Sequence, residues 1–233
     1  MAIIGRVERG RGSDAVVRLN GVTRMFGSVP ALVRVTMQID RGEVVLLRGA
    51  NGAGKSTLIR VVSTALSPTF GEGSVLGHDL IRGRHEIRRS VELLGHRTRL
   101  YEELTAQENL DFAAGLFGVR RGRPREHLER VGLGDVAGER VRSFSHGMRQ
   151  RVALARVLMR DPELILLDEP YAGLDQSSRG LVDELVTAAA ARGRTVVMSS
   201  HDPAPRPLAD RTITMAGGRV IAASGADASI GSG

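Results

Sequence analysis

The only lysine of the chain, Lys55, lies in a glycine-rich segment whose spacing is typical of a phosphate-binding loop. A glycine, four further residues and then Gly-Lys-Ser occur in order, as Gly49, Ala50, Asn51, Gly52, Ala53, Gly54, Lys55 and Ser56. Glycines let backbone N–H groups turn inward around an anion, and a helix that starts near Lys55 directs its positive end to the same place. All the other basic residues are arginine, which suggests that this position needs a compact ammonium rather than a planar guanidinium.

We expect this loop to bind the phosphates of a nucleoside triphosphate. Lys55 would reach the β- and γ-phosphates, and the hydroxyl of Ser56 would coordinate Mg²⁺. The alternative is a glycine-rich turn that caps an ordinary helix, but a predicted strand before the loop and a predicted helix after it favour phosphate binding. The ATP-binding residues expected in this segment are Gly49, Asn51, Gly52, Ala53, Gly54, Lys55, Ser56 and Thr57.

A pair of carboxylates follows a run of four apolar residues at 164–167. The run predicts a buried strand, and ligands bind at the carboxyl ends of the strands in parallel sheets. Asp168 would then hold Mg²⁺ through water, and Glu169 would orient or polarise the attacking water. The alternative is that the two carboxylates merely end a strand, but the phosphate loop argues against it.

A second motif resembles the signature sequence of the ATP-binding cassette (ABC) ATPases. The family form is Leu-Ser-Gly-Gly-Gln, and the segment at 144–151 matches it at Ser145 and Gly147 while departing from it at Phe144, His146 and Met148. At a helix start, a serine hydroxyl and free N–H groups form a second anion site. Because the phosphate loop already holds a triphosphate, this second site is available to a neighbouring subunit. The resemblance therefore implies an ATP-dependent homodimer with the signature acting in trans, although a plain N-cap is the alternative for Ser145.

Three further positions match the same family in the same order. Residues 173–175 resemble its D-loop, which makes Asp175 the expected D-loop residue, and His201 resembles its switch histidine at the γ-phosphate. Phe26 occupies the place of the aromatic residue that stacks on adenine. The resemblance covers roughly residues 16–220, and it implies that Glu169 and His201 are catalytic and that the cofactors are ATP and Mg²⁺. A loop aromatic packed on the core is the alternative for Phe26, and a buried, hydrogen-bonded histidine is the alternative for His201.

The chain departs from the family at the Q-loop. The family usually carries a glutamine there, whereas this chain has His96 after the predicted strand at 91–94. Mg²⁺ prefers oxygen ligands, so we expect His96 to bind water or sense a partner, with a surface histidine of no role as the alternative. Together with residues 100–110 and 145–148, this segment is similar to the ATP-binding subunit of the cytochrome c biogenesis haem exporter. Drug and polysaccharide exporter subunits share the Gly-Met of the signature.

The elements that must position these residues alternate between strand and helix at both ends of the chain. Residues 24–30 read as a loop, and residues 69–83 as a glycine-rich, turn-like segment. A hairpin is expected around Gly217 and Gly218, and a capping box at 105–108 opens one helix. The other predicted strands are 15–19, 33–39, 44–48, 91–94, 164–168 and 195–199. The other predicted helices are 55–66, 124–131, 147–159 and 177–191.

The pattern predicts an α/β P-loop NTPase fold of the ABC ATPase type, with a parallel-sheet core, an antiparallel β part and an inserted helical subdomain. We expect a flexible leader at 1–14, a single ABC ATPase domain at 15–224 with its helical insert at about 96–159, and a flexible tail at 225–233. The absence of cysteine excludes disulfides, thiolate zinc sites and a cysteine nucleophile. No apolar run approaches the roughly 20 residues of a membrane span, and nothing near Met1 resembles a signal peptide.

The resemblance implies an ATP-hydrolysing subunit of an ABC transporter that powers export through a separate membrane permease, with haem export for cytochrome c biogenesis as the finer hypothesis. The helical insert would dock on the permease, so the chain would be peripheral on the cytoplasmic side of the membrane. One alternative is the ATPase of a drug or polysaccharide exporter. Others are a nucleotide-dependent switch, against which Glu169 argues, and a nucleic-acid-associated ATPase, which the net charge of +7 permits. We expect no direct nucleic-acid partner, because the chain has one phosphate loop and no sustained heptads.

Overall fold

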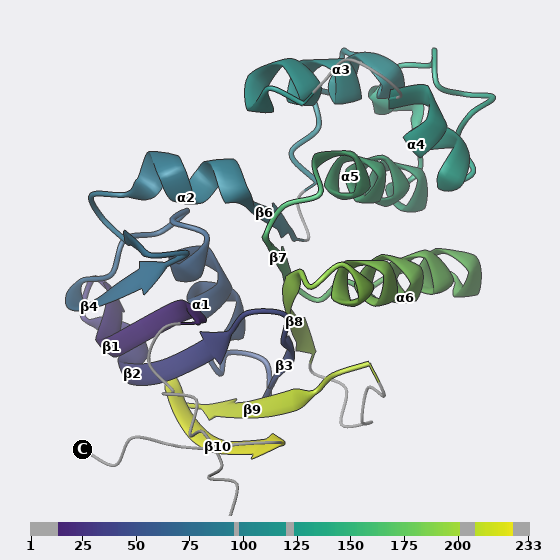
Figure 1. Ribbon diagram of the computed structural model, residues 1–233. Helices are drawn as coiled ribbons and strands as arrows, with labels where there is room; N and C mark the ends of the chain where they lie inside the picture. The colour runs from purple at the N-terminus through teal and green to yellow at the C-terminus, as the bar shows by residue number, and fades with distance from the viewer. Residues whose placement is uncertain (1–13, 96–97, 120–123, 201–207, 226–233) are drawn as a thin grey trace, which may run out of the picture.

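A computed structural model describes residues 14–95, 98–119, 124–200 and 208–225, which form two sheets and a set of helices (Figure 1). The smaller sheet has the strand order β2-β1-β4-β5, with β1 (Ala15–Phe26), β2 (Val29–Asp40), β4 (Phe70–Val75) and β5 (His78–Asp79). The larger sheet has the order β10-β9-β3-β8-β7-β6, with β3 (Val44–Arg48), β6 (Val91–Leu94), β7 (Leu164–Leu167), β8 (Thr195–Ser200), β9 (Arg211–Ala216) and β10 (Arg219–Gly225). The helices are α1 (Lys55–Val62), α2 (Arg84–Ser90), α3 (Ala106–Phe117), α4 (Pro124–Arg130), α5 (His146–Arg160) and α6 (Gln176–Ala191), with a 3₁₀ turn at Val141–Ser143.

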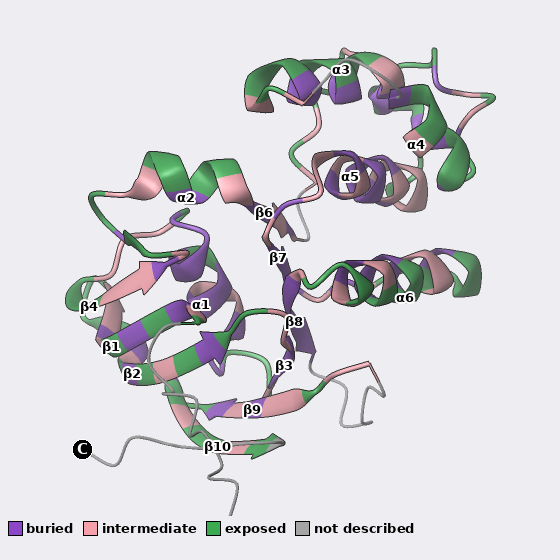
Figure 2. Cartoon of the chain, viewed as in Figure 1, coloured by how far each residue is buried: buried purple, intermediate pink, exposed green. Residues whose placement is uncertain are grey.

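The larger sheet is parallel from β9 to β6 and is buried on both faces. Alternate side chains of one strand point to opposite faces, so Val44 and Leu46 pack with the helices α3 to α6, while Val45 and Leu47 pack with α1 and the smaller sheet. Figure 2 shows the central strands as buried, with exposed residues on the outer helix faces. This double burial explains why the strands read as continuous apolar runs in the sequence.

The helical part is built from α3, α4 and α5, which share one core with α6. The predicted capping box is confirmed: the N–H of Glu108 donates to Thr105 Oγ1 at 3.1 Å, and the N–H of Thr105 donates to Glu108 Oε2 at 2.8 Å. Pro124 occupies the first position of α4, as expected, because it has no N–H to lose there. The predicted α/β fold with parallel, antiparallel and helical parts is therefore confirmed.

The expected loop at residues 24–30 is wrong. β1 continues to Phe26 and pairs with Val29 at the start of β2, so that only Gly27 and Ser28 turn between two long antiparallel strands. Gly27 has φ 59°, a conformation that glycine adopts without strain. The sequence predicts both strands too short, because mixed polar residues on an exposed sheet face hide the alternation of polar and apolar residues that marks a strand.

The turn-like reading of residues 69–83 is also wrong, since this stretch contains β4 and β5. A Cβ at Gly73 would lie 2.7 Å from Arg18 O, and one at Gly71 would lie 2.4 Å from Gly21 O, so these glycines allow β4 to approach β1 closely. The following helix α2 was not predicted. Glycine signalled a turn in the sequence, but here it permits strand packing.

Other boundaries differ by a few residues. Helix α1 ends at Val62 rather than at residue 66, and Thr64 just beyond it has φ 58°. The hairpin between β9 and β10 is confirmed: Gly217 and Gly218 form its turn with φ 54° and 76°, as a type I′ turn requires.

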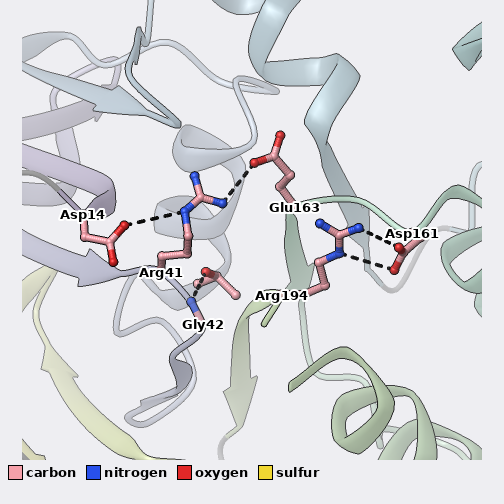
Figure 3. A network of polar contacts seen from close by, with 7 residues as sticks. Asp14, Arg41, Gly42, Asp161, Glu163 and Arg194 are labelled. Carbon is pink, nitrogen blue, oxygen red and sulfur yellow. Dashed lines mark hydrogen bonds and ion pairs between the residues drawn. The ribbon is translucent and has the colours of Figure 1, made fainter. Parts of the chain in front are cut away.

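The amino ends of the parallel strands are held together by charged side chains from the loops that precede them (Figure 3). The Arg41 guanidinium, before β3, lies 3.0 Å from Glu163, before β7, and 3.7 Å from Asp14. Arg194, before β8, pairs with Asp161 at 2.6 Å. We call these five residues the amino-end rim. Asp14, which the sequence assigned to the flexible leader, belongs to it. The rest of the leader, and the tail from residue 226, lie outside the described residues.

Candidate nucleotide-binding site

The phosphate loop connects the carboxyl end of β3 to the start of α1, and Lys55 is its most buried charged group, with 5% exposure. Its Nζ donates to Gly49 O at 2.7 Å and to Ala50 O at 3.2 Å. The same atom lies 3.6 Å from Glu169 Oε1. The ammonium is therefore held inside the curve of its own loop, facing a carboxylate from a different strand.

The loop keeps its shape because neighbouring backbone leaves room only for glycine. A Cβ at Gly49, where φ is 152°, would meet Met215 O at 2.3 Å, and one at Gly54, where φ is 102°, would meet Ala31 O at 2.7 Å. From the β9–β10 turn, the N–H of Gly218 donates to Ala53 O at 3.1 Å. These contacts fix the loop from outside, so its curvature does not depend on a ligand.

The start of α1 has no side-chain cap, because its N-cap residue is Gly54. The first N–H groups of any helix lack partners within the helix, and in this chain they face the phosphate loop. An anion placed there would meet both these N–H groups and the positive end of the helix dipole. The residues present therefore fit the phosphates of a nucleotide.

Two carboxylates at the end of β7 face the loop. Asp168 Oδ1 accepts hydrogen bonds from Ser56 Oγ at 2.8 Å and from Ser199 Oγ at 2.9 Å. Ser199, at the end of β8, also accepts from the N–H of Glu169 at 2.8 Å. Glu169 has φ 54°, which is strained for a residue other than glycine and is typical of functional positions. The ends of β3, β7 and β8 thus bring together the predicted Lys55, Ser56, Asp168 and Glu169.

A cavity of about 620 Å³ opens between these groups, a volume in the range of small-molecule sites. Its lining includes three residues that the sequence did not suggest, Ala31, Arg60 and Ala172. The other lining residues come from the phosphate loop and the two carboxylates: Asn51, Gly52, Ala53, Gly54, Lys55, Ser56, Thr57, Asp168 and Glu169. The hydroxyl of Ser56 and the carboxylate of Asp168 supply the hard oxygen donors that Mg²⁺ prefers. Among the described residues no group of three or more acidic or histidine side chains could cage a metal, and Mg²⁺ bound here would take its other ligands from phosphate oxygens and water.

Five of the predicted site residues that the structure describes do not line this cavity, and the first is Gly49 at the start of the phosphate loop. Phe26 is 48% exposed at the end of β1, and the guanidinium of Arg24 covers its ring at 4.7 Å from the centroid. Ser145 caps α5 by accepting from the N–H of Met148 at 3.2 Å. The lining also lacks Gly147 and Asp175. Within one chain, therefore, neither the signature nor Asp175 contributes to the lining of this cavity.

The signature and the D-loop are instead joined to each other. Asp175 caps α6, and its pKa is lowered to about 2, first by the backbone N–H of Ser178 and then by the hydroxyls of Ser178 and Ser177. Arg151, on the signature helix α5, donates to Ser178 Oγ at 2.9 Å and to Ser177 Oγ at 2.7 Å. A Cβ at Gly173 would lie 3.9 Å from His146 Cδ2. The two motifs therefore form one continuous surface.

The predicted residues His96 and His201 lie outside the described residues. Sequence reasoning missed Ser199, which links Asp168 to the backbone of Glu169. Its only signal was a Ser-Ser pair at the end of an apolar strand, where a buried hydroxyl needs a partner. The support of the phosphate loop by Gly218 and Ala31 had no local signal, because it depends on contacts between distant segments.

The chain is similar to known proteins along most of its length. A family model described as "ABC transporter" matches residues 32–172. The daunorubicin resistance ATP-binding protein DrrA3 of Streptomyces coeruleorubidus is 39% identical over 221 residues, covering 92% of this chain and 70% of that protein. The ABC transporter ATP-binding protein NatA of Bacillus subtilis is 38% identical over 216 residues, covering 88% of each. A solved dimeric ATP-binding cassette in a post-hydrolysis state, bound to ADP and Pi, has a TM-score of 0.81 at 28% identity and covers 90% of this chain and 98% of that one.

Proposed function

The chain belongs to the ABC transporter family as an ATP-binding subunit with ATPase activity, and from this we propose that it powers export through a separate membrane permease. The observation that carries the proposal is the convergence of Lys55, Ser56, Asp168 and Glu169 on one cavity from three neighbouring strands. A binding module that only holds a nucleotide does not need a carboxylate beside the phosphate site. Glu169 supplies a base at that place, which supports turnover.

We assign the roles from the contacts. Lys55 Nζ exchanges its carbonyl partners and Glu169 for phosphate oxygens when a nucleotide enters. That exchange frees the Glu169 carboxylate to orient and polarise a water molecule, while Ser199 holds the Glu169 backbone in place. Ser56 and Asp168 would hold Mg²⁺, which neutralises the charge that develops on the phosphates. The cradle of backbone N–H groups positions the phosphates without moving, because its glycines are fixed by their neighbours.

A second copy of the chain completes the site in this proposal. Ser145 and Gly147 lie at the start of α5 and are absent from the cavity lining, so the phosphates bound by one chain are open to the signature of another. Pairing each phosphate loop with a partner's signature gives two equivalent sites and closes with two-fold symmetry. The similarity to a dimeric solved cassette supports this arrangement.

The permease is proposed from the family and from the helices. None of the helices in the described ranges is long and apolar enough to cross a membrane. We propose that the part built from α3, α4 and α5 docks on cytoplasmic loops of an integral partner, which would make the chain peripheral on the cytoplasmic side of the membrane. For the cargo, the name of the Streptomyces relative supports the drug-type exporter over haem export. Nothing in the described residues favours nucleic acid as a partner.

Purification of the tagged chain from membranes in mild detergent tests the proposal. We expect an integral membrane protein to co-purify in stoichiometric amount, and ATP hydrolysis by the complex to be lost with Lys55→Arg but kept with Arg41→Lys, which makes the reverse exchange at the amino-end rim. Failure of any integral membrane protein to co-purify would contradict the transporter assignment alone, whether or not the chain hydrolyses ATP. A complex that hydrolyses ATP equally well with Lys55→Arg would contradict the assigned site.

A further inference from the structure

Glu169 begins a tight turn in the segment that leads from the end of β7 to the start of α6 (Figure 1). The N–H of Ala172 donates to Glu169 O at 3.1 Å, which closes a four-residue turn with Pro170 in its second position and Tyr171 in its third. Proline fixes the backbone at that position. A residue before proline prefers extended backbone, yet Glu169 has φ 54°. The turn therefore holds Glu169 in a strained conformation, and a contact that fixes the turn also restricts the direction of its carboxylate.

The two sides of this turn face different surroundings. Its first and last residues, Glu169 and Ala172, line the cavity at the phosphate loop. Tyr171 lies between them in the sequence but is only 7% exposed, and it belongs to the same buried cluster as Leu174 and Val182. The turn thus meets the nucleotide cavity on one side and is anchored in the core of the helical part on the other.

The anchor ends in a hydrogen bond to α6. The hydroxyl of Tyr171 donates to Asp183 Oδ1 at 2.5 Å. Hydrogen bonds from a hydroxyl to an ionised carboxylate are shorter and roughly twice as strong as neutral ones. Asp183 is exposed, so its charge stays in water while the ring of Tyr171 stays in the core. A phenylalanine would fill the same core position, and the hydroxyl therefore adds a fixed direction rather than packing.

This fixed direction becomes more important once a nucleotide is bound. The carboxylate of Glu169 lies 3.6 Å from Lys55 Nζ, and in the proposed function Lys55 exchanges this contact for phosphate oxygens. Ser199 holds the N–H of Glu169 at 2.8 Å, which fixes the beginning of the turn. The bond between Tyr171 and Asp183 fixes the turn at a second point, on a helix rather than on a strand.

We propose that Tyr171 is a positioning residue for Glu169, and that its bond to Asp183 keeps the carboxylate of Glu169 aimed at the water that attacks the bound nucleotide. The inference rests on the proposed function in taking Glu169 as the base that polarises this water. Tyr171 does not line the cavity, and the phosphates are bound by other residues. Its hydroxyl therefore affects the rate of the chemical step and not the affinity for ATP.

Steady-state ATP hydrolysis tests the inference on the purified chain, together with any integral protein that co-purifies. Tyr171→Phe keeps the ring and removes the hydroxyl, so kcat should fall on the order of tenfold while KM for ATP stays unchanged. Asp183→Ala should have the same effect, and Asp183→Asn, which keeps an acceptor oxygen, should retain most of the rate. Tyr171→Phe combined with Asp183→Ala should be no slower than either variant alone. Glu184→Gln removes the neighbouring exposed carboxylate of α6 and is the matched control, which should keep the wild-type rate.

A second measurement separates positioning from a purely structural role. Single-turnover hydrolysis of radiolabelled ATP is compared for Glu169→Gln with and without Tyr171→Phe. Because Glu169→Gln leaves no carboxylate to be aimed, the added substitution should cause no further loss. A tyrosine that only stabilises the fold would lower the rate by the same factor whether or not Glu169 is present.

The outcomes overturn different claims. A wild-type kcat in Tyr171→Phe, a loss that lies entirely in KM, or an equal loss with and without Glu169 would overturn the inference. If Tyr171→Phe hydrolyses ATP at the full rate while Glu169→Gln does not, the proposed function stands and the inference alone fails. Hydrolysis at the full rate by Glu169→Gln would contradict the base assigned in the proposed function, and the inference with it.

Discussion

The two ends of the parallel sheet use charged residues in opposite ways. At the amino-end rim, Arg41 and Arg194 pair with Asp14, Glu163 and Asp161, and every charge has its partner in the loops beside it (Figure 3). At the carboxyl end, the charged residues that follow β3 and β7, which are Lys55, Asp168 and Glu169, line a cavity instead. The same strands therefore support a closed, self-compensated edge and an open one.

The difference is also one of burial and strain. Arg41 is 47% exposed, so its ion pairs are screened by water, whereas Lys55 is 5% exposed and depends on partners placed around it. Glu169 is held in a left-handed conformation. Strained and buried charged groups persist where function needs them. Substitutions at the carboxyl end should therefore change activity, and substitutions at the amino end should change stability slightly.

The largest effect is expected at Lys55. Lys55→Arg keeps the charge but places a planar group in a curve that the glycines fix at the size of an ammonium. The rate of phosphate release from Mg·ATP should fall by on the order of 10³ or more, with little change in melting temperature. Arg41→Lys should leave the rate unchanged. The comparison of the two ends fails if both variants lose activity alike.

A buried charge that is fully compensated should behave differently again. Glu92 is as buried as Lys55, but two arginines neutralise it within the fold. Glu92→Gln leaves those arginines without a counter-charge, so we expect the free energy of unfolding to fall by about 3 kcal/mol. Chemical denaturation measures the change. A loss as small as that expected for an exposed ion pair would show that burial does not determine how much stability is lost when a charge is removed.

The amino-end rim should respond weakly. Arg41→Gln removes ion pairs with Glu163 and Asp14, whose side chains are largely exposed. We expect the free energy of unfolding to fall by less than about 1 kcal/mol, and ATP hydrolysis to stay at the wild-type rate. Added salt should shrink the difference between wild type and variant, because exposed pairs are screened. An activity loss would show that this rim is not merely structural.

The smallest effect concerns Asp175, which accepts hydrogen bonds from Ser177 and Ser178 at the start of α6. Its folded pKa of about 2 lies below the ordinary 3.8, so its charged form stabilises the fold above pH 4 and this stabilisation is lost as the pH falls from about 4 to 2. Asn also caps helices, so Asp175→Asn removes mainly the charge. The melting temperatures of wild type and variant should converge as the pH falls through this range. A difference in melting temperature that stays constant with pH would contradict the lowered pKa assigned to Asp175.

The sequence predicted the site where the chemistry is local. Lys55 and Ser56 are neighbours in one loop, and Asp168 and Glu169 follow one apolar run. The spacing alone therefore predicts that each pair lies just beyond the carboxyl end of a strand. Ser199 was missed because its role depends on which strand lies beside β7. The strands β4 and β5 were missed because glycine signals a turn and a close approach of strands in the same way.

The association state of Glu169→Gln tests the central claim most directly. This substitution keeps the side-chain shape but removes the carboxylate that polarises water, so bound ATP should persist and hold two chains together at their phosphate loops and signatures. By size-exclusion chromatography with light scattering, we expect a dimer with Mg·ATP and a monomer without it. Glu163→Gln at the amino-end rim should stay monomeric, and Glu169→Gln combined with Ser145→Arg should bind ATP without pairing. A Glu169→Gln protein that binds ATP yet stays monomeric at high concentration would contradict the account.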